Sequence, residues 1–285
     1  MHTGIAIFDT AYSIRIEELA REAEARGFES VWVPEHTHIP TSRRSPFAGG
    51  AELPEQYKHT LDPFVSLTAA AMVTTKLKVG TGICLVIERD TITTAKSVAS
   101  LDLVSSGRFL FGIGGGWNRE EMEHHGTDFP TRFKRLEEQV RAMKAIWTQD
   151  VAEFHGKFVD FEPIWAWPKP VQKPHPPIVI GGESAYTLQR VVDIGDGWFP
   201  RGRAGAEAVL KGLADLKARA AKAGRDMKTI STSVFAARTD AADLARLAEG
   251  GVTRAIFLLP SEGREKRSEE RRVGKECRSR WSPYH

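Results

Sequence analysis

Apolar and polar positions follow two patterns along the chain, and the two patterns alternate. Short apolar runs of the kind seen in buried parallel strands are followed by segments whose apolar residues recur at helical spacing. The clearest unit runs from Lys78 to Glu121, where two apolar runs enclose a segment with Ala95, Val98 and Leu101 on one face. This unit predicts a strand, a helix and a second strand.

The same alternation extends over most of the chain and predicts eight strands. They are expected at residues 4–8, 28–33, 79–86, 109–113, 178–180, 197–200, 230–237 and 255–259. A predicted helix follows each strand except the last, whose helix is missing or replaced. Alternation at this length predicts an α/β fold, a (β/α)8 TIM barrel with insertions, and the alternative is an open doubly wound sheet.

Two segments interrupt the alternation and are the expected insertions. Residues 37–61 show no apolar periodicity, and loops of this length are typically lids or binding loops. Residues 154–161, FHGKFVDF, place aromatic residues around a His-Gly turn, which indicates a small hairpin.

Composition indicates a soluble globular enzyme, with 41% hydrophobic and 27% charged residues. No stretch approaches the ~20 consecutive apolar residues of a membrane-spanning helix. The N-terminus shows no basic, apolar leader, and the two cysteines, Cys84 and Cys277, give no disulfide framework. We therefore expect a cytoplasmic protein with one domain over residues 1–263.

The positive net charge of +3 comes from the last segment. Residues 264–285 contain eight basic and four acidic residues, which leaves 32 basic and 33 acidic residues in the rest of the chain. A basic tail could bind nucleic acid or an acidic membrane surface. Because this segment lacks apolar periodicity, we favour a non-native, disordered end and expect neither kind of partner.

Candidate chemistry lies just after the predicted strands, where α/β barrels place their sites. His36 follows the second strand, and a glycine cluster, GIGGG at 112–116, follows the fourth. Gly181 and Gly182 precede Ser184 at a predicted helix start, which suits a phosphate group but also suits a plain tight turn. Trp117 could stack on a ring system or serve as a core residue.

Several other chemistries are disfavoured by motif. His38 lies two residues after His36, but a zinc site needs three or four ligands, and neither HExxH nor CxxC occurs, so we expect no metal. The GxSxG elbow of serine hydrolases is absent. The glycines at 112–116 do not match GxGxxG after a first strand, which disfavours a Rossmann dehydrogenase.

Several motifs occur in order with consistent spacing. They include WVPEH at 32–36, KVGTGICL at 78–85, GRFLFGIGGGWN at 107–118, PPIVIGG at 176–182 and GDGWFP at 195–200. Over residues 3–261 the chain resembles the luciferase-like monooxygenase superfamily, and most of all its branch that uses the deazaflavin coenzyme F420. The resemblance implies a TIM barrel with F420, or alternatively FMN, across the carboxyl ends of the strands.

The resemblance also implies roles for individual residues. His36 faces the reactive edge of the ring, and the bulged third strand, often with a cis peptide in this family, backs the ring. A sugar-phosphate dehydrogenase of the superfamily has a glutamate acid where this chain has Trp117, so Glu120 or Glu121 could substitute only by proximity. The resemblance implies His36, Gly82, Ile83, Gly114, Gly115, Gly116, Asn118, Gly181 and Gly182 as cofactor-binding residues, with His36 also catalytic. Glu120 is a candidate catalytic residue by its proximity. Arg201, just past the sixth predicted strand, is a candidate cofactor-binding cation, because the deazaflavin carries an acidic tail that needs cationic partners.

The function expected from these observations is F420-dependent hydride transfer with a small organic substrate. One alternative is a reduced-FMN monooxygenase with the same fold. Another is a non-catalytic protein that binds the deazaflavin. Because many relatives are dimers or tetramers, we expect a homo-oligomer.

Overall fold

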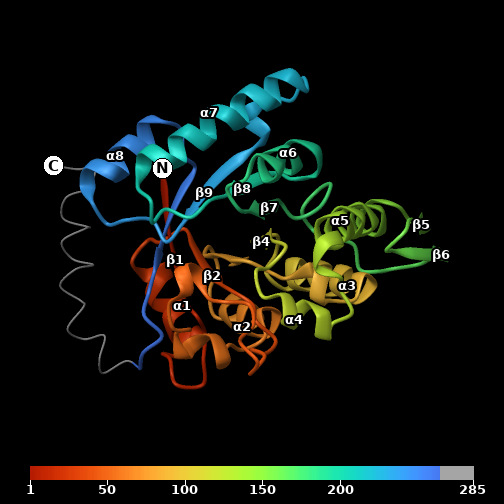
Figure 1. Cartoon of the computed structure of the whole chain (residues 1–285), viewed down its shortest axis with the longest axis horizontal. Helices are drawn as coiled ribbons and strands as arrows, with labels where there is room; N and C mark the ends of the chain where they lie inside the picture. The colour runs from red at the N-terminus through yellow and green to blue at the C-terminus, as the bar shows by residue number, and fades with distance from the viewer. Residues whose placement is uncertain (264–285) are drawn as a thin grey trace.

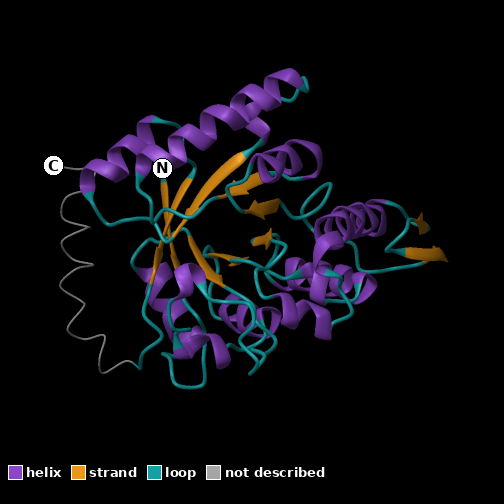
Figure 2. Cartoon of the chain, in the orientation of Figure 1, coloured by secondary structure: helices purple, strands orange, loops and turns teal. Residues whose placement is uncertain are grey.

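A computed structural model describes residues 1–263. Eight parallel strands close into a barrel in the order β1-β10-β9-β8-β7-β4-β3-β2, with helices packed around it (Figures 1 and 2). The predicted TIM barrel is therefore confirmed. The predictions about residues 264–285, the non-native tail and the replaced eighth helix, lie outside the described residues.

The elements match the alternation in the sequence. The barrel strands are β1 (His2–Ala6), β2 (Ser30–Val33), β3 (Lys78–Thr81), β4 (Phe109–Ile113), β7 (Ile178–Gly181), β8 (Gly197–Phe199), β9 (Ser231–Phe235) and β10 (Arg254–Leu258). The helices are α1 (Ile16–Ala25), α2 (Pro63–Met72), α3 (Thr91–Val104), α4 (Arg119–His124), α5 (Arg132–Thr148), α6 (Ala185–Ile194), α7 (Ala206–Lys222) and α8 (Ala241–Glu249).

Several helices begin where the sequence supplies a capping side chain. The Asp62 carboxylate accepts hydrogen bonds from the backbone N–H groups of Phe64 and Val65, with Pro63 at the first helical position of α2. Ser184 caps α6 in the same way through Thr187 N–H. These caps fix where each helix leaves the barrel rim.

Two apolar layers hold the barrel together. The larger layer lies between the strands and the surrounding helices. A smaller cluster fills the barrel interior and consists of Ala6, Trp32, Leu110, Val179, Phe199 and Ile256. Ile83, Phe235 and Leu258 pack onto this cluster but remain partly exposed, so they form an apolar floor beneath the barrel mouth.

The third strand is shorter than predicted. The apolar run at 79–86 forms β3 only as far as Thr81, and residues Val86–Glu88 form a 3-10 turn. Beyond Thr81 the chain forms different hydrogen bonds, because Cys84 N–H donates to the Gly112 carbonyl and Leu85 N–H donates to the Glu35 carboxylate. The apolar run thus continues past the strand into the floor of the barrel mouth.

Both predicted insertions are present. Strands β5 (Ala152–His155) and β6 (Asp160–Ile164) form an antiparallel hairpin that projects beyond α5 at the right of Figure 1. The segment 37–61 contains only two 3-10 turns, Ala48–Gly50 and Glu55–Lys58, and otherwise has no regular structure. It leaves the end of β2 and returns to α2.

Candidate functional site

The predicted site residues gather at one end of the barrel. Since all eight strands are parallel, their carboxyl ends form a single rim. The loops after five of these strands carry the predicted residues. They are His36 after β2, Gly82 and Ile83 after β3, Gly114, Gly115, Gly116, Asn118 and Glu120 after β4, Gly181 and Gly182 at the end of β7, and Arg201 after β8.

The glycines admit neighbours that a side chain would exclude. A Cβ atom on Gly114 would lie 2.0 Å from the Cδ1 atom of Ile83, and one on Gly181 would lie 3.2 Å from its Cγ2 atom. Ile83 therefore projects between the ends of β4 and β7, and its peptide bond with Gly82 is cis. The resemblance implied this arrangement of the third strand.

His36 is held by a glutamate that the sequence singled out only by proximity. The His36 Nδ1 atom lies 2.8 Å from the Glu121 Oε2 atom, and both side chains are buried. The Glu121 Oε1 atom also accepts the Thr37 N–H at 3.1 Å. Because an ionised carboxylate only accepts hydrogen bonds, we place the hydrogen of neutral His36 on Nδ1, which leaves Nε2 for a ligand.

Glu120, the predicted catalytic acid, contacts the long loop instead. It accepts the Ser45 N–H at 3.2 Å, and its carboxylate lies 3.3 Å from the Arg44 guanidinium. Burial acts to raise the pKa of Glu120, but the hydrogen bonds with Ser45 and the charge of Arg44 lower it. The structure thus brings Glu121, and not Glu120, against His36.

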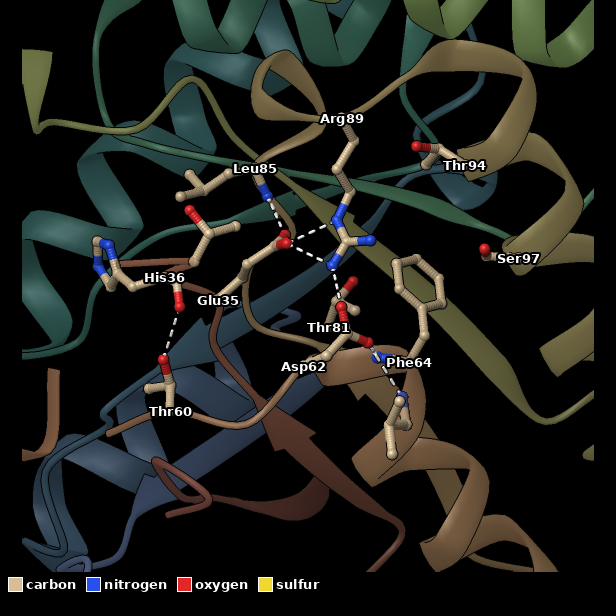
Figure 3. Close-up of polar contacts among 12 residues, drawn as sticks. Glu35, His36, Thr60, Asp62, Phe64, Thr81, Leu85, Arg89, Thr94 and Ser97 are labelled. Carbon is tan, nitrogen blue, oxygen red and sulfur yellow. Dashed lines mark hydrogen bonds and ion pairs between the residues drawn. The ribbon is translucent and has the colours of Figure 1, made fainter. Parts of the chain in front are cut away.

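A second carboxylate lies beside His36 in the chain but points the other way (Figure 3). Glu35 accepts the Leu85 N–H at 2.7 Å and the Arg89 Nε–H at 2.6 Å. Arg89 also binds Asp62, the cap of α2. This network ties the end of β2 to the turn after β3 and so fixes the backbone that carries His36.

Another buried carboxyl group, Glu88, lies in the same region and has a raised pKa. Burial raises its pKa to about 9, and the negative charges of Glu121 and Glu35 add to this effect. Its Oε2 atom is buried without a hydrogen-bond partner in the described part of the chain. At neutral pH Glu88 is therefore an uncharged carboxylic acid.

Asn118, like Glu88, is a buried residue with side-chain polar atoms that make no hydrogen bond within residues 1–263. Its side chain is 2% exposed, and neither Oδ1 nor Nδ2 finds a partner among residues 1–263. A buried amide without partners is costly and rare in folded proteins. Asn118 therefore fits a site that binds a polar ligand.

A cationic cluster that the sequence reasoning missed lies beside the glycine loop. The Phe133 ring lies 2.5 Å from where a Cβ on Gly115 would be. The guanidinium groups of Arg132 and Arg190 lie 4.4 and 4.1 Å from the centre of that ring, and Arg190 also forms an ion pair of 2.8 Å with Glu137. Burial and the charge of Arg190 lower the pKa of Arg132. The available signal was the RFKR segment at 132–135, which looked like an ordinary helix start.

Arg201, predicted to bind an acidic tail, already has a partner. Its guanidinium forms two hydrogen bonds of 2.9 and 2.8 Å with the Glu183 carboxylate. Burial acts to raise the pKa of Glu183, but the hydrogen bonds from Arg201 lower it. The charge of Arg201 is thus largely neutralised within the protein.

The long loop places aromatic side chains over the site. Tyr57 and Trp117 lie 5.2 and 6.0 Å from the His36 ring, and Phe47 contacts both of them. Trp117 is thus part of the site and not of the barrel core. These rings provide an apolar wall on the loop side of His36.

Three histidines attach this loop to α4. The His38 Nε2 atom lies 2.8 Å from the His124 Nδ1 atom, and the Thr37 hydroxyl lies 2.7 Å from the His125 Nε2 atom. No group of three or more His, Cys, Asp or Glu residues within 1–263 is arranged to hold a metal ion. The same residues contain no helix long and apolar enough to cross a membrane.

The carboxyl end of the parallel barrel thus carries a histidine–carboxylate pair, glycine loops and an amide with no partner within residues 1–263, which are features of an enzyme-like ligand site. Comparison with known proteins assigns the family. The family model described as luciferase-like monooxygenase matches residues 9–282, and the chain belongs to this family. Members of the family are oxidoreductases and monooxygenases.

The chain is similar in sequence to two further proteins and in fold to a third. The chain is 40% identical to the uncharacterized protein Rv0953c of Mycobacterium tuberculosis, over 91% of this chain and 92% of that one. It is 34% identical to an FMNH(2)-dependent dimethylsulfone monooxygenase of Pseudomonas putida, over 53% of this chain and 42% of the relative. The coenzyme F420-dependent tetrahydromethanopterin reductase of Methanopyrus kandleri has a similar structure, with a TM-score of 0.74, 17% identity and coverage of 99% and 100%.

Proposed function

We propose that the protein is an F420-dependent oxidoreductase that transfers a hydride between the deazaflavin ring and a small organic substrate. The observation that carries the proposal is Asn118, a buried amide that directly follows the glycine loop and Trp117 and has no partner among the described residues 1–263. A flat heterocycle with polar edges would satisfy that amide. The sequence motifs that resemble the F420 branch, and a protein of similar fold named for coenzyme F420, support the choice of ligand.

The rim has a place for the phosphate of such a cofactor. Gly182 has a φ of +123°, which suits glycine, and it leads to the capped N-terminus of α6 at Ser184. Helix N-termini bind phosphate through free N–H groups and the helix dipole. We assign Gly181 and Gly182 to this phosphate, together with Arg132 and Arg190, whose guanidinium groups lie on the Phe133 ring beside Gly115.

The ring would then lie on the apolar floor of Ile83, Phe235 and Leu258, with its reactive edge toward His36. When bound, the deazaflavin supplies a carbon that accepts or gives up a hydride. His36 Nε2 takes or returns the proton of the substrate hydroxyl or carbonyl oxygen, and Glu121 stabilises the imidazolium that forms. The wall of Phe47, Tyr57 and Trp117 excludes water from this step and favours a substrate with an apolar portion.

A reduced-FMN monooxygenase is the second candidate. The relative named for reduced FMN is 34% identical to this chain, and FMN shares the ring and the ribityl phosphate of the deazaflavin. The same floor and phosphate site would hold it. The difference lies in the reaction, because the monooxygenase must react with oxygen.

Two assays on the purified protein separate these candidates. In the first, the absorbance of oxidised F420 is followed with a panel of short-chain and aromatic alcohols under nitrogen. In the second, oxygen consumption is followed with chemically reduced FMN and the same compounds. We expect bleaching of F420 by at least one alcohol and no substrate-dependent oxygen uptake. The reverse result would assign the protein to the monooxygenases, and tight F420 binding without any turnover would favour the binding protein.

A further inference from the structure

We propose that Glu88 and Asn118 form an uncharged hydrogen-bonding pair that binds the polar edge of the cofactor ring. The inference deepens the proposed function and rests on it, because the ring is the ligand. It concerns two buried side chains, one in the turn after β3 and one before α4, that neither the hydride step nor the phosphate site uses.

The positions of the two side chains carry the inference. Glu88 is 6% exposed and Asn118 2% exposed, and each has buried polar atoms without a partner in the region the structure describes. Gly116 links them, since it lies two residues before Asn118 and a Cβ on it would be 3.9 Å from the Glu88 Oε1 atom. Gly116 also has a φ of +62°, which keeps this loop turned over Glu88. Two side chains of complementary type, each with polar atoms that find no partner within residues 1–263, therefore belong to the same loop region: Glu88 lies against Gly116, and Asn118 follows Gly116 by two residues.

Charge decides what can bind there. Glu88 is faced by Glu35 from the end of β2, by Glu121 from α4 and by Arg89 from its own turn. Arg89 is committed to Glu35 and Asp62, and Gln139 of α5 donates to backbone carbonyls of the same turn. An anion would be repelled by the carboxylates that remain. A group that binds Glu88 and Asn118 is therefore expected to be uncharged.

The chemistry of the pair identifies the kind of group. A carboxylic acid offers one O–H donor and one carbonyl acceptor, and a carboxamide offers N–H donors and a carbonyl acceptor. Together they match an edge with an N–H flanked by carbonyl oxygens. The pyrimidine edge of both flavin and deazaflavin rings has this arrangement, so the pair would serve either cofactor.

The protonation of Glu88 can be tested without any cofactor. Infrared spectra of the protein in H2O and D2O at pH 7 should contain the C=O band of a protonated carboxylic acid, and that band should disappear as the pH is raised through about 9. The band should be absent in Glu88→Gln. Glu29→Gln is the matched control, because Glu29 is ion-paired with Arg254 and its pKa is lowered to about 2, so the band should survive there.

Ligand titration then tests the role of the pair. Binding of oxidised FMN, riboflavin and F420 is followed by fluorescence at pH 7 and at pH 10. The wild type should bind about tenfold more weakly at pH 10, when Glu88 is ionised, whereas Glu88→Gln should bind as tightly as the wild type at pH 7 and keep that affinity at pH 10. Glu88→Leu and Asn118→Leu should each weaken binding by roughly tenfold at pH 7.

The outcomes separate the inference from the proposed function. A wild type without the acid band, or an affinity that falls equally with pH in Glu88→Gln, would overturn the inference while leaving the cofactor assignment intact. Failure of all three compounds to bind would overturn the proposed function, and the infrared result would still decide whether Glu88 is protonated. If Glu88→Gln does not fold, the pH titration of the carboxylic-acid C=O band in the wild type and in Glu88→Asp decides whether residue 88 is protonated at pH 7.

Discussion

Two parts of the barrel rim differ sharply in charge. The segments after β2, β3 and β4 bury four carboxyl groups, Glu35, Glu88, Glu120 and Glu121, with Arg89 facing Glu88 and Arg44 beside Glu120. Beside the ends of β4 and β7, two guanidinium groups lie against Phe133. From this difference we infer that an elongated ligand with an uncharged ring and an anionic group would bind with its anionic group toward the two guanidinium groups. The difference teaches that charge, as well as shape, can orient the cofactor.

The largest effect is expected from removing His36, which we propose lies between the cofactor ring and the substrate. We expect His36→Ala to lower turnover by about 10²–10⁴ because it removes the group that exchanges the substrate proton. Cofactor affinity should change far less. Steady-state kinetics and a fluorescence titration of the same sample measure the two effects, and equal losses would make His36 a binding residue only.

The next effect concerns Glu121, which holds His36 and the start of the loop. Glu121→Ala leaves the His36 Nδ1–H and the Thr37 N–H without an acceptor, so we expect turnover to fall by about 10–100-fold. Measured again in the His36→Ala background, the same change should have almost no further effect on turnover. Additive losses in this double-mutant cycle would show that Glu121 acts independently of His36.

Glu88 should give the protein a distinctive dependence of stability on pH. Its pKa in the folded state, about 9, exceeds the ordinary value of 4.5, so the folded state binds more protons between these values. The stability contribution is fully present below pH 4.5 and is lost as the pH rises to about 9. Glu88→Gln should therefore become more stable than the wild type over this range, by a few degrees in Tm at pH 8. A constant Tm difference from pH 5 to pH 9 would contradict this account.

The smallest effect is expected from Arg201. Because Glu183 already neutralises it, Arg201→Gln should change F420 and FMN affinity by less than about threefold. The sequence alone suggested a larger effect through the acidic tail of the deazaflavin. A tenfold loss specific to F420 would restore Arg201 as a tail-binding residue and would show that its pairing with Glu183 breaks when the tail binds.

The fold and the place of the site could be predicted because they depend on local patterns. The spacing of apolar residues predicted the strands, and Asp62-Pro63 predicted the start of a helix. Because the strands are parallel, the loops after β2, β4 and β7 must lie at the same end of the barrel. Pairing between distant side chains carries no such local signal. Glu121 and Glu120 are equivalent in sequence, and only the direction of α4 puts one against His36 and the other against Ser45.

The remaining parts of the site depend on burial, which the sequence does not state. Glu88 appears in ERD, an ordinary polar turn, and its environment becomes acidic only when Glu35 and Glu121 fold beside it. Arg132 and Arg190 lie 58 positions apart in the numbering of the chain and meet only because α5 and α6 pack on neighbouring strands. Arg201 was predicted to be available because its partner, Glu183, lies on a different loop.

The orientation of the cofactor across the rim is the central claim, and one titration series tests it most directly. FMN and riboflavin differ only in the phosphate, so both are titrated into the wild type, Arg132→Met with Arg190→Met, and the control Arg119→Met, whose guanidinium is exposed and paired with Glu123. We predict that the double variant weakens FMN binding by about 10–100-fold and leaves riboflavin within about threefold, while Arg119→Met changes neither. An equal loss for riboflavin and FMN would show that the cationic end does not bind the phosphate and would contradict the orientation.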